Sequence, residues 1–180
     1  MTSILNDVSA LATPALIGRI SADTNESENA VLDGLHLSMS TLLVLLADHC
    51  DDDHFIRQLA SLAADTGVES QPGRATQPGG RHATTAEQWL ESQYGDRLPS
   101  VAEGIGLRVG ISRSSAESLL AIAAPLVLGY LGSALRSGTF DASGLTARLR
   151  YERGRFASAA QSEHPMMASI GDGGSHEFTA

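Results

Sequence analysis

The sequence predicts an all-α protein, and two observations carry this prediction. Apolar residues recur at helical spacing along the chain, and no stretch shows the strict alternation and β-branched content of a strand. Capping residues, prolines and glycines stand between the periodic segments, where helices are expected to begin and end. With 180 residues, of which 42% are hydrophobic, the chain is long enough to bury a core.

The first half is expected to form four helices. A first helix covers residues 3–11, and a second begins at Thr13-Pro14, because proline is favoured at the first helical position. Asn25 or Ser27 is expected to cap a long third helix that ends near residue 48.

The fourth helix is expected to start at the run Asp51, Asp52 and Asp53, because carboxylates complement the positive end of a helix dipole. Residues 65–84 are rich in glycine and proline and carry few apolar side chains, which predicts a linker.

The second half is expected to hold four more helices. Gly110 is a natural left-handed residue at a helix end, and Ser112 or Ser114 is expected to cap the longest helix. The segment 157–180 is polar and is expected to be a flexible tail. The four helices are expected over residues 85–94, 99–109, 115–135 and 141–153.

An internal repeat appears when residues 14–55 are aligned with residues 99–140 without a gap. We therefore expect two related units of short, long and short helices, over 1–64 and 85–156, in an orthogonal helical array. The alignment pairs Pro14 with Pro99, Ile20 with Ile105, Ser27 with Ser112, Leu35 with Leu120, Leu43 with Leu128 and Phe55 with Phe140.

Three short segments of the second unit form a recognisable set: GIS at 110–112, APLVLG at 124–129 and FDASGL at 140–145. With them, the stretch over about 97–153 resembles the YidB-like family of small bacterial helical proteins of unknown function. A weaker second copy covers about 14–64. The resemblance implies an all-α array in a bacterial cytoplasm and supplies no catalytic residues.

Charge is unevenly distributed in a chain of net charge −9. The first unit is acidic and the second is basic, so we expect a non-enzymatic scaffold or protein-interaction module that associates head to tail in rings or filaments. A homo-oligomer or a protein partner is expected. The candidate interaction residues are Asp51, Asp52, Asp53, Arg148, Arg150, Arg153 and Arg155.

Nucleic-acid binding through the 148–155 segment is the alternative, because its arginines are interleaved with Tyr151. A second alternative is membrane association of the uncharged run 118–135. A buried core helix explains this run as well, with a bend at Pro125 and close helix packing at Gly129 and Gly132.

Composition excludes several chemistries. The chain has no lysine, which excludes a Walker-type phosphate loop and Schiff-base catalysis. Cys50 is the single cysteine, which excludes an internal disulfide and favours a reducing, cytoplasmic location. No signal peptide is expected at the N-terminus, and neither a cofactor nor an enzymatic activity is expected.

A weak metal-site candidate lies in the HCDDDH segment at 49–54. His49, Asp52 and His54 offer imidazole and carboxylate ligands. The histidines are five residues apart, which does not place both on one helical face. A turn followed by an acidic helix start is therefore the expected structure.

Overall fold

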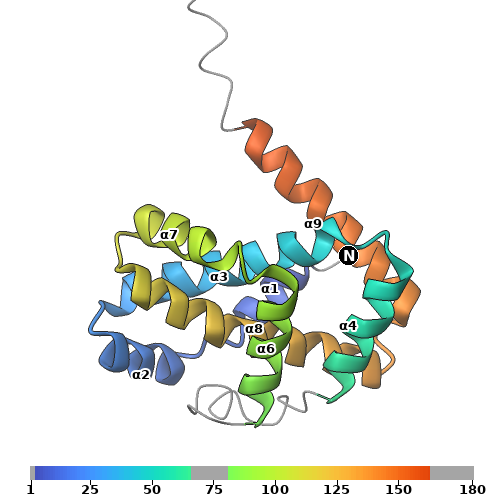
Figure 1. Cartoon of the computed structure of the whole chain (residues 1–180), viewed down its shortest axis with the longest axis horizontal. Coiled ribbons are helices and arrows are strands. Elements are labelled where there is room, and N and C mark those ends of the chain that lie inside the picture. Colours follow the sequence, from blue (N-terminus) through green and yellow to red (C-terminus); the bar gives the residue numbers. More distant parts are fainter. Residues whose placement is uncertain (1–2, 66–80, 163–180) are drawn as a thin grey trace, which may run out of the picture.

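The computed structural model describes residues 3–65 and 81–162, which form eight helices and no strand (Figure 1). The prediction of an all-α fold is confirmed. The helices are α1 (Ile4–Ser9), α2 (Pro14–Thr24), α3 (Glu28–Asp48), α4 (Asp53–Asp65), α6 (Arg81–Tyr94), α7 (Leu98–Val109), α8 (Arg113–Arg136) and α9 (Ala142–Ser162).

Capping residues set most of the helix starts. The hydroxyl of Thr13 caps α2, which has Pro14 at its first position. Ser27 caps α3 and Ser112 caps α8, each by accepting a hydrogen bond from the backbone N–H three residues further on. Gly110 ends α7 with a φ of 79°, in the left-handed region. The predicted caps at these positions are confirmed.

Positions paired by the predicted repeat have the same role in the local structure. Asn25 pairs with Gly110 and ends α2 with a φ of 58°, as Gly110 ends α7. Of the two residues expected to cap α3, Ser27 does so, and Asn25 instead ends the preceding helix. The turn that leads into each long helix is therefore built in the same way.

The two long helices, α3 and α8, pack against each other and run in the same direction (Figure 1). Near their N-terminal ends, the Glu26 carboxylate accepts hydrogen bonds from the Ser112 N–H and the Ser115 hydroxyl, at 3.1 and 2.8 Å. Further along, a Cβ added to Gly34 would lie 2.6 Å from Leu119 Cδ1. Gly34 and Leu119 are paired in the predicted repeat, so the helices meet at matching positions.

The last helix of each half packs on the long helix of the other half. α4 packs chiefly on α8, and α9 packs chiefly on α3. Of the remaining helices, α1 and α2 pack chiefly on α3, and α6 and α7 pack chiefly on α8. Contacts between the halves are also made by α7 with α3 and by α1 with α8. One hydrophobic cluster joins both halves and includes Leu35 and Leu43 of α3 with Leu120 and Leu131 of α8.

Several element boundaries differ from the sequence-based expectations. The first helix ends at Ser9, and α6 begins at Arg81, within the segment expected to be linker. α9 continues to Ser162, into the segment expected to be tail. This extension is rich in alanine, a strong helix former. The rest of the predicted linker and tail, 66–80 and 163–180, lies outside the described residues.

By length and composition alone, α3 and α8 are each apolar enough to cross a membrane. Half of the most apolar window of α3 and 67% of that of α8 are buried inside the protein, as in the core helices of soluble proteins. α8 continues as one helix across Pro125, and Gly129 and Gly132 are buried in it. The predicted bend at Pro125 and the orthogonal arrangement stay predictions.

The interlocked packing predicts that neither half folds alone. We expect residues 1–65 and 81–180, made as separate chains, to lack a cooperative thermal transition by circular dichroism, because α4 and α9 would each lose the helix they cover. Mixing the two chains is expected to restore helicity and a cooperative melt. A single half that melts cooperatively on its own would contradict this packing.

Candidate interaction surfaces

Asp51 pairs with two of the arginines that were predicted to form interactions. Its Oδ1 lies 2.7 Å from Arg150 Nη2, and its Oδ2 lies 3.0 Å from Arg153 Nη1. The two guanidinium groups hold the pKa of Asp51 below its usual range. All three side chains are about half exposed, so each pair contributes little to stability. At this point the acidic and basic halves meet within one chain.

Arg148 and Arg155, the other two predicted arginines, have different contacts. The Cζ of Arg148 lies 5.0 Å from the centre of the Phe140 ring, which is a cation–π distance. Arg155 Nη1 lies 3.5 Å from Glu152 Oε2. Between them on α9, Tyr151 is 44% exposed. This part of α9 therefore presents one exposed tyrosine and several arginines. The positive charge of the arginines is partly balanced by carboxylates of the same chain.

The predicted metal-site candidates take part in the local structure before α4. Asp52 Oδ1 accepts hydrogen bonds from the backbone N–H groups of His54 and Phe55, at 2.8 and 3.2 Å, and these hold the pKa of Asp52 below its usual range. The His49 ring packs on Phe55, with ring centres 5.0 Å apart. Asp52 therefore precedes α4 as its cap, and Asp53 is the first residue of α4. Across residues 3–65 and 81–162, no three His, Cys, Asp or Glu side chains gather to hold a metal.

Glu152 is a buried carboxylate that sequence reasoning missed. It is 1% exposed, and its Oε1 accepts hydrogen bonds from the Ser3 hydroxyl and the Ile4 N–H, both at 2.7 Å. Ser3 itself makes no side-chain cap of α1, so Glu152 of α9 caps this helix instead. No local pattern could reveal this contact, because its partners lie at the opposite end of the chain.

The outer face of α7 carries the most exposed large apolar side chain of the described segments. This side chain is Leu107, which is 81% exposed. A pocket of about 280 Å³ lies beside it. A Cβ added to Gly104 or Gly110 would meet nothing within 4 Å, so open space flanks Leu107 on both sides. We call this region the Leu107 surface; it consists of Gly104 and the pocket residues Glu103, Gly106, Leu107, Gly110, Ile111 and Arg113.

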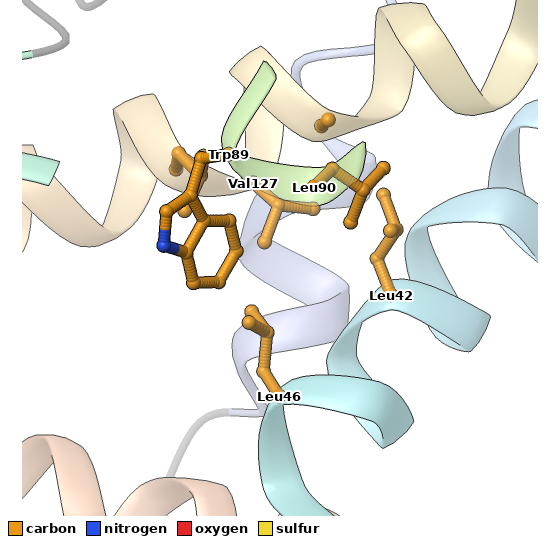
Figure 2. A pocket seen from close by; sticks show the side chains of 7 residues that line it. Leu42, Leu46, Trp89, Leu90 and Val127 are labelled. Carbon is orange, nitrogen blue, oxygen red and sulfur yellow. The ribbon is translucent and has the colours of Figure 1, made fainter. Parts of the chain in front are cut away.

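Two other hollows lie among the described residues. Figure 2 shows Trp89 and Leu90 of α6 facing Leu42 and Leu46 of α3, with Val127 of α8 between them. The cavity among them measures about 10 Å³, the size of a single water, and reads as a packing gap. A second pocket, of about 260 Å³, lies where α6, α7 and α8 meet and is mostly lined by apolar side chains.

Comparisons with known proteins identify a family but no activity. The model of the family described as "Bacterial protein of unknown function (DUF937)" matches residues 6–134, which reach from α1 into the last turn of α8. No curated protein and no solved structure matches the chain. α9, with its arginines, lies beyond the matched residues.

Replacing Asp51 tests the ion pairs with α9. Because the pKa of Asp51 is lowered on folding from its ordinary 3.8, the pairs stabilise the protein above that pH and are lost as pH falls through the lower folded value. We expect Asp51→Asn to lower the urea midpoint at neutral pH, and the difference from the parent protein to vanish in strong acid. Asp33→Asn, at an exposed side chain with no ion pair among the described residues, is the control. A difference that does not change with pH would contradict this role.

Replacing Glu152 tests the tie between α1 and α9. Glu152→Ala leaves the buried Ile4 N–H without an acceptor, which costs about 1–3 kcal/mol of unfolding free energy. Glu152→Gln keeps an acceptor oxygen and is expected to lose less. Urea unfolding measures both variants, with the exposed Glu91→Ala as control. Equal losses for the Gln and Ala variants would show that the acceptor does not matter.

Proposed function

We propose that this chain, which belongs to the DUF937 family of bacterial proteins of unknown function, is a non-enzymatic scaffold that associates with copies of itself or with a partner protein. The family supplies no activity. The proposal therefore depends on what the surface of this chain can bind.

The observation that carries the proposal is the exposure of Leu107 beside an open pocket. Burying a leucine side chain gains about 1.5–3 kcal/mol, and this gain is left unused on the surface of the isolated chain. A single exposed leucine is ordinary. Here it stands between two glycines and next to a hollow of about 280 Å³, which together make a surface that another protein can fill.

Electrostatic attraction between the two halves supports association less strongly. Asp51, Arg150 and Arg153 already pair with one another inside the chain. We therefore assign the main contact to the Leu107 surface. Head-to-tail rings or filaments, with the remaining charges on α4 and α9 orienting the copies, stay one form that association can take.

The organisation of the chain belongs to the same proposal. We propose two related helical units, the second of which is YidB-like over about 97–153, joined by the glycine- and proline-rich linker. The matching turns at Asn25 and Gly110 and the matching caps Ser27 and Ser112 support the two-unit organisation. A cytoplasmic location is proposed on the content of one cysteine, Cys50, which is buried.

Nucleic-acid binding through α9 is the second-ranked function. Arg150 and Arg153 are about half exposed near the exposed Tyr151, which suits phosphate contact and base stacking. Asp51 competes with phosphate for both guanidinium groups, which lowers the rank of this function. Membrane association ranks third, because half of the most apolar window of α3 and 67% of that of α8 are buried inside the protein.

Leu107→Arg is the variant that tests the scaffold function. We expect sedimentation velocity over a concentration series to show species larger than a monomer for the parent protein and a monomer for Leu107→Arg. The variant is expected to keep its thermal stability, because position 107 is 81% exposed. Asp51→Asn, away from the Leu107 surface, is the control and should still associate. A parent protein that is monomeric at every concentration and salt level would contradict the proposal of self-association.

A further inference from the structure

We propose that the Leu107 surface binds the same surface of a second copy, so that the chain forms a closed dimer about a two-fold axis beside Leu107. This inference rests on the proposed scaffold function and specifies its partner. In such a dimer the two α7 helices lie antiparallel, and each Leu107 side chain enters the pocket of the other copy. The contact uses up both surfaces, so assembly stops at two copies.

The spacing of residues along α7 is suited to a two-fold contact. Gly104 and Gly110 stand three residues before and three residues after Leu107. A two-fold axis between antiparallel helices places the residues before Leu107 in one copy opposite the residues after Leu107 in the other copy. Gly104 of each copy therefore faces Gly110 of the other, and the two leucines meet at the centre. A heterologous contact does not require Gly104 to face Gly110.

Gly104 has no internal reason to be glycine. It lies within α7, where glycine is the poorest helix former after proline, and a Cβ added to it would meet nothing within 4 Å. Gly110 differs, because its φ of 79° favours glycine for the backbone itself. Gly106 differs too, since its Cβ would lie 3.0 Å from the Ile111 carbonyl oxygen. Close approach of a second α7 backbone would explain the glycine at position 104, because a residue without a side chain lets two helices come close together.

The charges at the pocket are complementary under the same axis. Glu103 precedes Leu107 by about one turn, and Arg113 follows it at the start of α8, and both line the pocket. An antiparallel second copy brings its Arg113 to Glu103 and its Glu103 to Arg113. In the single chain, Arg113 pairs with Glu117 at 2.9 Å, with both side chains at least half exposed. Such an exposed pair is weak and leaves Arg113 able to turn to a new carboxylate.

The pocket also fits an aliphatic side chain better than a small polar ligand. Its apolar lining includes Leu107 and Ile111. The buried side-chain polar atom without a hydrogen bond in the described residues is Glu152 Oε2, which belongs to α9 and not to this pocket. A leucine side chain from a second copy fills the pocket with apolar atoms and needs no hydrogen bond.

Gly104→Ala separates this dimer from a purely structural role of the glycine. We expect the variant to melt at a higher temperature than the parent protein in dilute solution, because alanine favours the helix. In sedimentation equilibrium, the same variant should have a higher dissociation constant for the dimer, because the methyl group keeps the second helix away. Gly154→Ala is the matched control at another helical glycine with open surroundings, and it should leave the dimer unchanged. Unchanged dimer affinity in Gly104→Ala would overturn the inference.

Charge reversal tests the pairing of Glu103 with Arg113. Glu103→Arg and Arg113→Glu are each expected to weaken the homodimer, because each variant would place two pairs of like charges at the interface. Mixing the two single variants should restore a heterodimer, and the double variant should restore a homodimer. Weakening in the single variants without either restoration would overturn this pairing.

Leu107→Cys places a thiol beside the proposed axis, and mild oxidation should join two chains through residue 107. Cys50 is 1% exposed and should not react, so the parent protein is the control. Assemblies larger than a dimer, or no cross-link despite association, would overturn the two-fold dimer and leave the scaffold function standing. A protein that stays monomeric throughout would overturn both the two-fold dimer and the proposed self-association.

Discussion

The contact between α3 and α8 is the constraint on which the rest of the structure depends. Both helices are apolar around most of their circumference, so each must be covered on several sides. Their direct contact, with Leu119 seated on Gly34, covers one side of each. The other helices of both halves cover the remaining sides. Because Gly34 has no side chain, the two backbones can come close enough for this arrangement.

The need to cover two central helices also explains the interlocked topology. α4 lies on α8 and α9 lies on α3, so each half completes the core of the other. The Glu152 carboxylate adds a polar tie, because it caps α1 from the far end of the chain. Asp51 adds a second link between the halves through Arg150 and Arg153. We therefore expect the chain to unfold as one cooperative unit despite its repeated sequence pattern.

The same packing decides which surfaces remain for a partner. Core burial uses most apolar side chains of α3 and α8, and the strongest acid–base contacts of the two halves form inside the chain. The outer face of α7, with Leu107 and an open hollow, is left uncovered. Association through this face needs no rearrangement of the core, and it is compatible with a rigid scaffold.

Local sequence by itself determined the helices and most of their ends. Thr13, Ser27, Ser112 and Gly110 act on backbone groups within a few residues, so their roles could be predicted from the sequence. Tertiary structure alone decided the crossing of α4 and α9, the partners of Asp51 and Glu152, and the exposure of Leu107. These depend on residues far apart in the chain, and the apolar spacing of α7 does not tell which of its side chains the neighbouring helices will leave in water.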